Sequence, residues 1–308
     1  MFLDRHAIGL EISQSGPALV LAEGKSVLPT LVRYATAEFP PETLRVSFKE
    51  ANIINPAQFV ATVRDTHLKL CCKQTRVSVA LPDATGRVLT MDLDTRFKNH
   101  EEGVDLIRWK LKKSFPLDVS DVHLDYQQLQ QRESGEISVL VALVSRGVVT
   151  QYEDLLVEAG LEPFQIDFAT LNVFHLLSQR FEREGNTALV SWFRGSLGVM
   201  VFTDGVLEFY RHKEIPGMNH ETNRLYREVN SSLLVYRDRK PGQPLDQIFF
   251  ATDMIEPATL KSVVSEASGL DAKGVDLDPF LLHSREKIDR RQFSHLAVAL
   301  ATATRNLR

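Results

Sequence analysis

The residues that could carry chemistry in this sequence are not spaced as in a metalloenzyme or a hydrolase. The nine histidines form no His-x-x-x-His pair, and Cys71 and Cys72 are adjacent rather than in a Cys-x-x-Cys pair, so a metal site has little support. We interpret His212 and His220 as polar loop or strand-end residues and the two cysteines as structural. Three serines in turn-like segments lack the Gly-x-Ser-x-Gly surroundings of a nucleophilic serine: Ser13, Ser15 and Ser191.

A basic cluster surrounds Trp109, formed by Arg108, Lys110, Lys112 and Lys113. One interpretation is the solvated side of a half-buried helix, with Trp109 in a hydrophobic core. The other is a docking surface, centred on Arg108 and Trp109, for a partner peptide or for acidic headgroups. The sequence leaves both interpretations open.

Composition indicates the class of protein that must position these residues. The chain has 308 residues, 44% of them hydrophobic and 25% charged, which is ordinary globular usage and enough for two lobes. A net charge of -4 argues against broad binding to nucleic acid or to an anionic membrane. Neither a signal peptide nor an apolar stretch approaching ~18 residues is present, and adjacent cysteines favour a reducing compartment. We therefore expect a soluble, cytoplasmic α/β protein.

Short strand-like segments alternate with longer helical ones. Apolar and β-branched residues predict seven strands at Ala7–Ile12, Ala18–Ala22, Leu31–Ala37, Arg76–Leu81, Val88–Leu93, Val122–Leu129 and Ser138–Ser145. Apolar residues at helical spacing predict helices at Val148–Ala159, Glu101–Phe115, Asn219–Tyr236, Pro257–Gly269 and Gln292–Asn306. This mixture is typical of an α/β fold.

A strand–turn–strand pattern near the start of the chain is repeated in its second half. The segment Ala7–Gly24 aligns without gaps with Ala188–Gly205, at an offset of 181 residues. In each copy, two apolar strands precede an acidic-Gly turn and a third strand. The repeat predicts one structural unit used twice, and hence two lobes with a cleft between them.

Several segments together resemble the PilM family, the FtsA-like cytosolic proteins of type IV pilus assembly. The opening Ile8–Ser13 is similar to the first strand and phosphate loop of that family. The other similar segments follow in family order: 107–109, 115–118, 124–126, 141–167, 227–236 and 246–248. The GspL protein of type II secretion shares the same plan and stays open as an alternative.

The resemblance implies an actin-like, ribonuclease H-like fold of two lobes, with a small α+β subdomain inserted in the first lobe. On this basis the first lobe comprises residues 1–37 and 146–187. Residues 38–145 form the inserted subdomain, and residues 188–308 form the second lobe.

In that fold ATP is held by loops in which small residues admit the phosphates and acidic residues hold Mg²⁺. The resemblance places seven residues at these positions, and they depart from the family pattern of Asp-x-Gly and Gly-Gly: Glu11, Ser13, Ser15, Ser191, Trp192, Thr252 and Asp253. We therefore expect a degenerate nucleotide site and no cofactor, with ATP and Mg²⁺ as ligands only if the site still binds them. The alternative is a working ATPase of the same fold.

The resemblance also implies a partner. PilM-like proteins bind the cytoplasmic N-terminal tail of a single-span inner-membrane protein, PilN, in a groove where the insert meets the first lobe. We therefore expect a non-catalytic adaptor at the cytoplasmic face of the inner membrane. The cytosolic domain of a GspL-like type II secretion protein is the further alternative.

Overall fold

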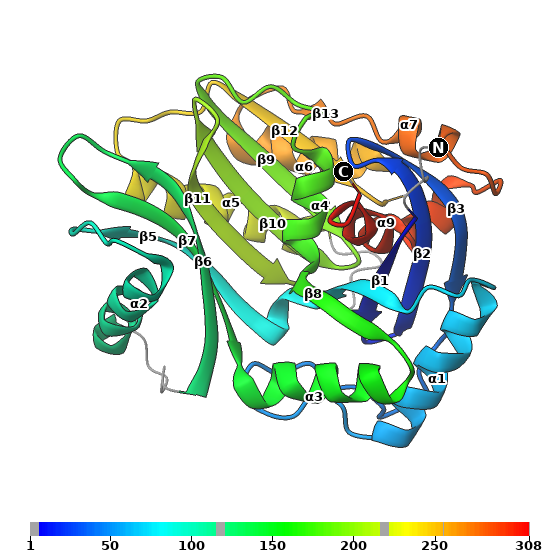
Figure 1. Ribbon diagram of the computed structural model, residues 1–308. Coiled ribbons are helices and arrows are strands. Elements are labelled where there is room, and N and C mark those ends of the chain that lie inside the picture. Colours follow the sequence, from blue (N-terminus) through cyan, green and yellow to red (C-terminus); the bar gives the residue numbers. More distant parts are fainter. Residues whose placement is uncertain (1–5, 115–120, 216–221, 255, 308) are drawn as a thin grey trace.

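The computed structural model describes residues 6–114, 121–215, 222–254 and 256–307, which form two five-stranded sheets and a smaller three-stranded sheet (Figure 1). The PilM-like segment 115–118, His220 and the predicted helix start at Asn219 lie outside these residues. Within them, no helix is both long and apolar enough to cross a membrane.

The first sheet has the strand order β3-β2-β1-β4-β8. Its strands are β1 (Ala7–Ser13), β2 (Gly16–Lys25), β3 (Leu28–Thr36), β4 (Arg76–Leu81) and β8 (Glu162–Phe168). Strands β1, β2 and β3 form an antiparallel meander, whereas β4 and β8 add to it in parallel. The central strands are buried on both faces and read as continuous apolar runs, as expected for strands covered by helices on both sides.

The second sheet repeats this arrangement with the order β11-β10-β9-β12-β13, which confirms the internal repeat. Its strands are β9 (Asn186–Phe193), β10 (Ser196–Thr203), β11 (Val206–Glu214), β12 (Gln247–Thr252) and β13 (Lys273–Gly274). Ser13 pairs with Gly16 at the first hairpin turn, and Phe193 pairs with Ser196 at the second. Ser13 therefore corresponds to Phe193, one residue off the ungapped alignment.

Helices cover the sheets in three layers. On the outer face of the first sheet lie α1 (Pro56–Lys69) and α3 (Arg146–Glu158). On the outer face of the second lie α5 (Thr222–Arg239) and α6 (Pro257–Ser268). Between the two sheets lie α4 (Ala169–Leu177) and α9 (Ala297–Thr304), whose apolar side chains share one core with residues of both sheets.

The C-terminal segment returns to the first sheet, in contrast to the prediction that residues 188–308 all form the second lobe. The short helices α7 (Asp278–Leu282) and α8 (Arg290–Ser294) precede α9, and Leu31 of β3 exchanges backbone hydrogen bonds of 3.0 and 2.8 Å with His283 and Arg285. Helix α9 packs on β1 so closely that a Cβ on Gly9 would lie 2.0 Å from the carbonyl oxygen of Ala299. Only glycine fits at this crossing.

The insert is smaller than the predicted range 38–145. Strand β4 and helix α1 belong to the first lobe, and the insert begins after a 3-10 turn, η1 (Asp83–Thr85). It consists of β5 (Gly86–Leu93), α2 (His100–Ser114), β6 (Val122–Gln131) and β7 (Ile137–Ser145). Its sheet has the order β5-β7-β6, and α2 packs on one face over a core of its own.

Candidate functional site

The hairpin turns of the two lobes face each other, and one side chain joins them. Arg194 lies in the turn between β9 and β10 with φ 53°, a left-handed conformation that non-glycine residues rarely adopt. Its guanidinium reaches the turn between β1 and β2, where Nη2 donates to Ser15 Oγ at 2.8 Å and to Ser13 Oγ at 3.2 Å. This cross-lobe contact brings together two of the loops that the sequence analysis singled out.

The same guanidinium is paired with a buried carboxylate. Arg194 Nε lies 3.5 Å from Glu11 Oε1, and Glu11 is only 4% exposed. Burial raises the pKa of Glu11, and the nearby charge of Arg194 opposes that rise. The second oxygen, Oε2, has no hydrogen-bond partner among the described residues. Glu11 thus depends on Arg194 for compensation of its charge.

Arg194 also contacts the segment before α9. Its Nη1 lies 2.5 Å from Nδ1 of His295, and because a guanidinium only donates, Nδ1 must accept and the ring proton must sit on Nε2. Partial burial and the charges of Arg194 and Arg291 lower the pKa of His295. The imidazole is therefore neutral in this arrangement.

Asp253 completes the surroundings of Arg194. Its carboxylate accepts the backbone N–H of Arg194 at 3.0 Å. Burial, partly offset by Arg194, raises the pKa of Asp253 to about 7. Its neighbour Thr252 is the last residue of β12. The Thr252 hydroxyl accepts a hydrogen bond from the backbone N–H of Met254 at 3.0 Å, which stabilises the turn after β12. Three of the expected nucleotide-site residues, Glu11, Ser13 and Asp253, therefore lie together around Arg194.

Strand register decides which residue corresponds to Glu11. Glu11 pairs with Ala18 across its hairpin, and Ser191 pairs with Gly198 at the matching position of the other hairpin. Ser191 Oγ contacts the carbonyl oxygen of Gly198 at 3.4 Å. At the position equivalent to Glu11, the second lobe therefore has a hydroxyl in place of a carboxylate.

The two aromatic residues after Ser191 point to opposite sides of β9. Trp192 packs into the core of the second lobe with residues of α5 and α6. Phe193 packs into the core between the sheets, with residues of α9. Trp192 is thus a core residue of one lobe, and Phe193 contributes to holding the lobes together.

A second polar cluster, which the sequence does not predict, lies beside the β9–β10 turn. Asp83 follows β4, accepts Thr170 Oγ1 at 3.0 Å and Ser196 Oγ at 3.2 Å, and faces His212 and Glu214 of β11. The only sequence signal was the alternation of His212 and Glu214 along a strand, which places both on one face. Nothing in the sequence joins them to Asp83.

A groove of about 320 Å³ runs between the insert and the first lobe. Strand β8 forms one wall, and it is an edge strand that pairs only with β4 within the described residues. Residues of β6, β7 and α3, together with Leu81 of β4 and Arg305, complete the lining. The charged and ionisable residues in the lining are His123, Asp125, Glu153, Asp167 and Arg305.

Arg108 and Trp109 do not line this groove. They lie on α2, on the far side of the insert sheet from β8 (Figure 1). Arg108 donates to the carbonyl oxygen of Val122 at 3.2 Å, and Trp109 is 60% exposed with Lys113 stacked 3.5 Å above its ring. Trp109 is therefore a surface residue, and the interpretation that places it in a core is wrong.

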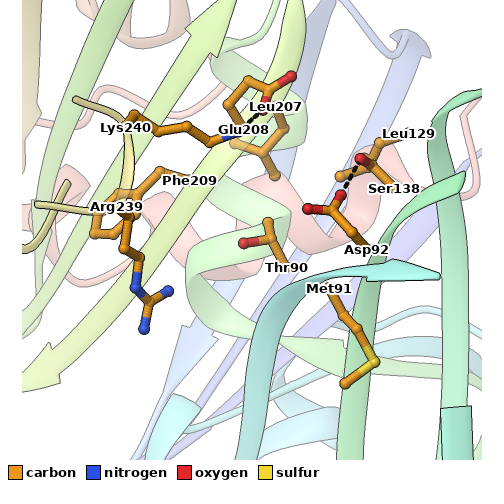
Figure 2. Close-up of a pocket in the computed structure, with 10 residues that line it drawn as sticks. All are labelled: Thr90, Met91, Asp92, Leu129, Ser138, Leu207, Glu208, Phe209, Arg239 and Lys240. Atoms are coloured by element: carbon orange, nitrogen blue, oxygen red, sulfur yellow. Dashed lines mark hydrogen bonds and ion pairs between the residues drawn. The ribbon is translucent and has the colours of Figure 1, made fainter. Parts of the chain in front are cut away.

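A smaller pocket of about 180 Å³ marks the junction of the insert with the second lobe (Figure 2). Asp92 faces Ser138 within the insert, and Lys240 reaches Glu208 at 2.5 Å within the second lobe. Arg132 bridges the two sides, 3.9 Å from Asp92 and 4.0 Å from Glu208. Charge pairs at this junction accompany apolar contacts, because Val88, Leu129 and Leu140 of the insert pack against the core that contains Leu207 and Tyr210 of the second lobe.

The sequence matches no protein-family model and no curated protein. The fold, however, is similar to solved structures. One is a PilM–PilN type IV pilus biogenesis complex, with a TM-score of 0.79 and 18% identity over 99% of this chain and 100% of that chain. A second is the cytoplasmic domain of EpsL, an inner-membrane component of the type II secretion system of Vibrio cholerae, with a TM-score of 0.52 and 10% identity over 82% and 84%.

A third similar structure is a Bacteroides thetaiotaomicron protein of unknown function with an actin-like ATPase fold. It has a TM-score of 0.52 and 9% identity, and the match covers 96% of each chain. Together these similarities show that the chain has the predicted actin-like fold.

Proposed function

We propose that this chain is a non-catalytic adaptor at the cytoplasmic face of an inner-membrane pilus assembly complex, and that it binds an extended tail of a PilN-like single-span membrane protein. The observation that carries the proposal is the groove along the edge strand β8. The similarity to a PilM–PilN complex over the full chain supports a partner of this kind.

The wall formed by β8 suits an extended peptide. Five consecutive residues, 163–167, are half-buried, which leaves side chains on both faces of the strand partly accessible. An edge strand offers unpaired backbone groups to a peptide that adds as a further strand, while the pockets beside it select alternate side chains.

The charges of the groove indicate what the tail should carry. Among the described residues of the lining, Arg305 is the only Lys or Arg, and it is paired with Asp167 at 3.4 Å. Asp125 and Glu153 add further negative charge to the same lining. A tail with apolar side chains and at least one basic residue would complement this groove.

The proposed function does not use ATP. Mg²⁺ and phosphates need acidic ligands and open backbone at both turns. Here Glu11 is paired with Arg194, Ser191 stands at the second acidic position, and the guanidinium lies against the hydroxyls of the first turn. The residues present therefore fit a Mg·nucleotide poorly.

The test is binding of synthetic peptides from the cytoplasmic tail of a PilN-like single-span protein of the same organism, measured by calorimetry. We expect micromolar affinity, because a short segment buries little surface and loses entropy when it becomes ordered. No heat at high peptide excess would overturn the adaptor proposal.

Two aromatic residues provide a matched pair of variants for locating the site. Phe164 lines the groove beneath Arg76 at 4.3 Å, and Trp109 lies on α2 beneath Lys113. We expect Phe164→Ala to weaken peptide binding about tenfold or more, and Trp109→Ala to leave it unchanged. The reverse result would move the docking surface to α2.

The similarity to the EpsL cytoplasmic domain supports a second candidate, a component of a type II secretion system. The same assay separates the two candidates, because a peptide from a secretion-system membrane partner would then bind and the pilus-type tail would not.

A further inference from the structure

Three ionisable side chains from both lobes converge beside the β9–β10 turn. Asp83 comes from the first lobe, at the end of β4, and His212 and Glu214 come from β11 of the second lobe. His212 Nε2 lies 3.8 Å from Asp83 Oδ2 and 3.4 Å from Glu214 Oε1, and the three ligand atoms all lie within 4.8 Å of one another. These distances between ligand atoms are close to those expected when each ligand lies about 2.0–2.2 Å from one shared ion.

The surroundings contain space and an unsatisfied polar group. A cavity of about 350 Å³ is lined by these three residues and by Tyr210. Tyr210 is 5% exposed, and its hydroxyl lies close to Asp83 and Thr170 without a hydrogen bond of good geometry to any described residue. A buried hydroxyl of this kind normally has a partner such as a water or a ligand group. The cavity therefore has room for an ion with its bound water.

The carboxylate of Asp83 is already oriented by its neighbours. Its Oδ2 accepts hydrogen bonds from Thr170 Oγ1 and from Ser196 Oγ. Ser196 Oγ also lies 2.7 Å from His212 Nε2, so a bound ion would take the place of this hydroxyl between the two ligand atoms. The guanidinium of Arg87, which also lines the cavity, donates to the carbonyl oxygen of Gly86 at 2.7 Å and lies over Phe48. Arg87 nonetheless lies close enough for its charge to act on His212, and Lys213 is a second cation in the lining.

We propose that Asp83, His212 and Glu214 form a binding site for a Zn²⁺-type transition-metal ion that joins the two lobes. Two carboxylates balance the charge of a divalent ion. The imidazole selects Zn²⁺ over Mg²⁺ and Ca²⁺, which prefer oxygen ligands alone. Water supplies the fourth ligand on the cavity side, within reach of the Tyr210 hydroxyl.

Metal binding at this site would act on the lobes as a clamp. The ligands belong to sheets that are otherwise joined by α4, α9 and their shared core. Ser196, which contacts both Asp83 and His212, begins β10 two residues after Arg194. The ion would therefore also fix the turn that carries Arg194.

The experiment titrates ZnCl₂ into the full chain by calorimetry, with MgCl₂ in parallel. We expect one equivalent of Zn²⁺ to bind, with affinity lowered at least tenfold in Glu214→Gln and lost in His212→Gln. Glu214→Gln is isosteric and its side chain is 39% exposed, so it should fold even if His212→Gln does not. Glu162→Gln, an exposed acid on β8, is the matched control and should bind as the unmodified chain does.

Absence of Zn²⁺ binding would overturn the proposal, as would equal binding of Mg²⁺ with the same dependence on Glu214. Binding that survives both ligand variants but is lost in Cys71→Ser/Cys72→Ser would place the ion at the thiols instead and would also overturn it. X-ray absorption of the Zn²⁺ complex should show nitrogen and oxygen ligands without sulfur.

Discussion

The guanidinium of Arg194 donates a hydrogen bond of 2.8 Å to the hydroxyl of Ser15, so that the turn of one hairpin is tied to the turn of its counterpart in the other lobe. The two residues are 179 positions apart in the chain. The arrangement places a protein cation, fixed by a left-handed turn, between the loops that hold phosphates in ATP-binding members of the fold.

Loss of this cation should destabilise the chain through Glu11. In Arg194→Ala the buried carboxylate of Glu11 keeps its burial cost and loses its counter-charge, so the free energy of unfolding should fall by about 1–3 kcal/mol. Urea denaturation measures the change. In a Glu11→Gln background the same substitution should cost clearly less, and equal costs in both backgrounds would show that the two groups are not coupled.

Asp253 should make stability fall as pH rises. Its folded-state pKa is about 7, above the ordinary value of 3.8, so between these values the folded chain binds more protons than the unfolded chain. Stability then decreases with pH in this window and levels off above it. Asp253→Asn should be more stable than the unmodified chain at about pH 8, with the difference vanishing near about pH 4. Parallel pH profiles in urea denaturation would contradict this.

Nucleotide should not stabilise the chain. A ligand present at a hundredfold excess over its Kd adds about 2.7 kcal/mol to the free energy of unfolding, which is visible as a rise in Tm. We expect thermal melts with millimolar Mg·ATP and with Mg²⁺ alone to coincide. A Mg²⁺-dependent rise that disappears in Glu11→Ala would instead favour a working ATPase.

Helix α9 should depend on glycine at position 9. Gly9→Ala places a methyl group 2.0 Å from the carbonyl oxygen of Ala299, so α9 must shift away from β1. We expect a loss of about 1–3 kcal/mol or more. Gly147→Ala is the control, because at the start of α3 the nearest atom to the added Cβ would be 3.9 Å away. Its stability should be unchanged or slightly raised.

Much of the local structure follows from the sequence alone. Alternating and continuous apolar runs predicted the strands from Ala7 to Leu81 and the paired hairpins. Helical spacing predicted α3 and its end near Gly160, which has φ 87°. The missing second carboxylate was visible at Ser191. These features depend on residues close together in the chain, whose periodicity decides which face of an element is apolar.

Long-range placement came only from the tertiary structure. Parallel pairing put β4 beside β1, and the crossing at Gly9 brought α9 back to the first sheet. The predicted helix from Gln292 is divided into α8 and α9 around His295. Hydrophobic patterning shows that a face is buried but does not specify against which partner, and so it could not place these elements.

The same reason applies to the sites. Arg194 meets Glu11, and Asp83 meets His212, only because two sheets pack with their hairpin turns facing each other. In the sequence Arg194 is an ordinary turn residue and His212 an ordinary strand residue. Side-chain charge and strand position were readable from the chain, whereas the pairing that gives these residues their chemistry was decided by how the two lobes fold together.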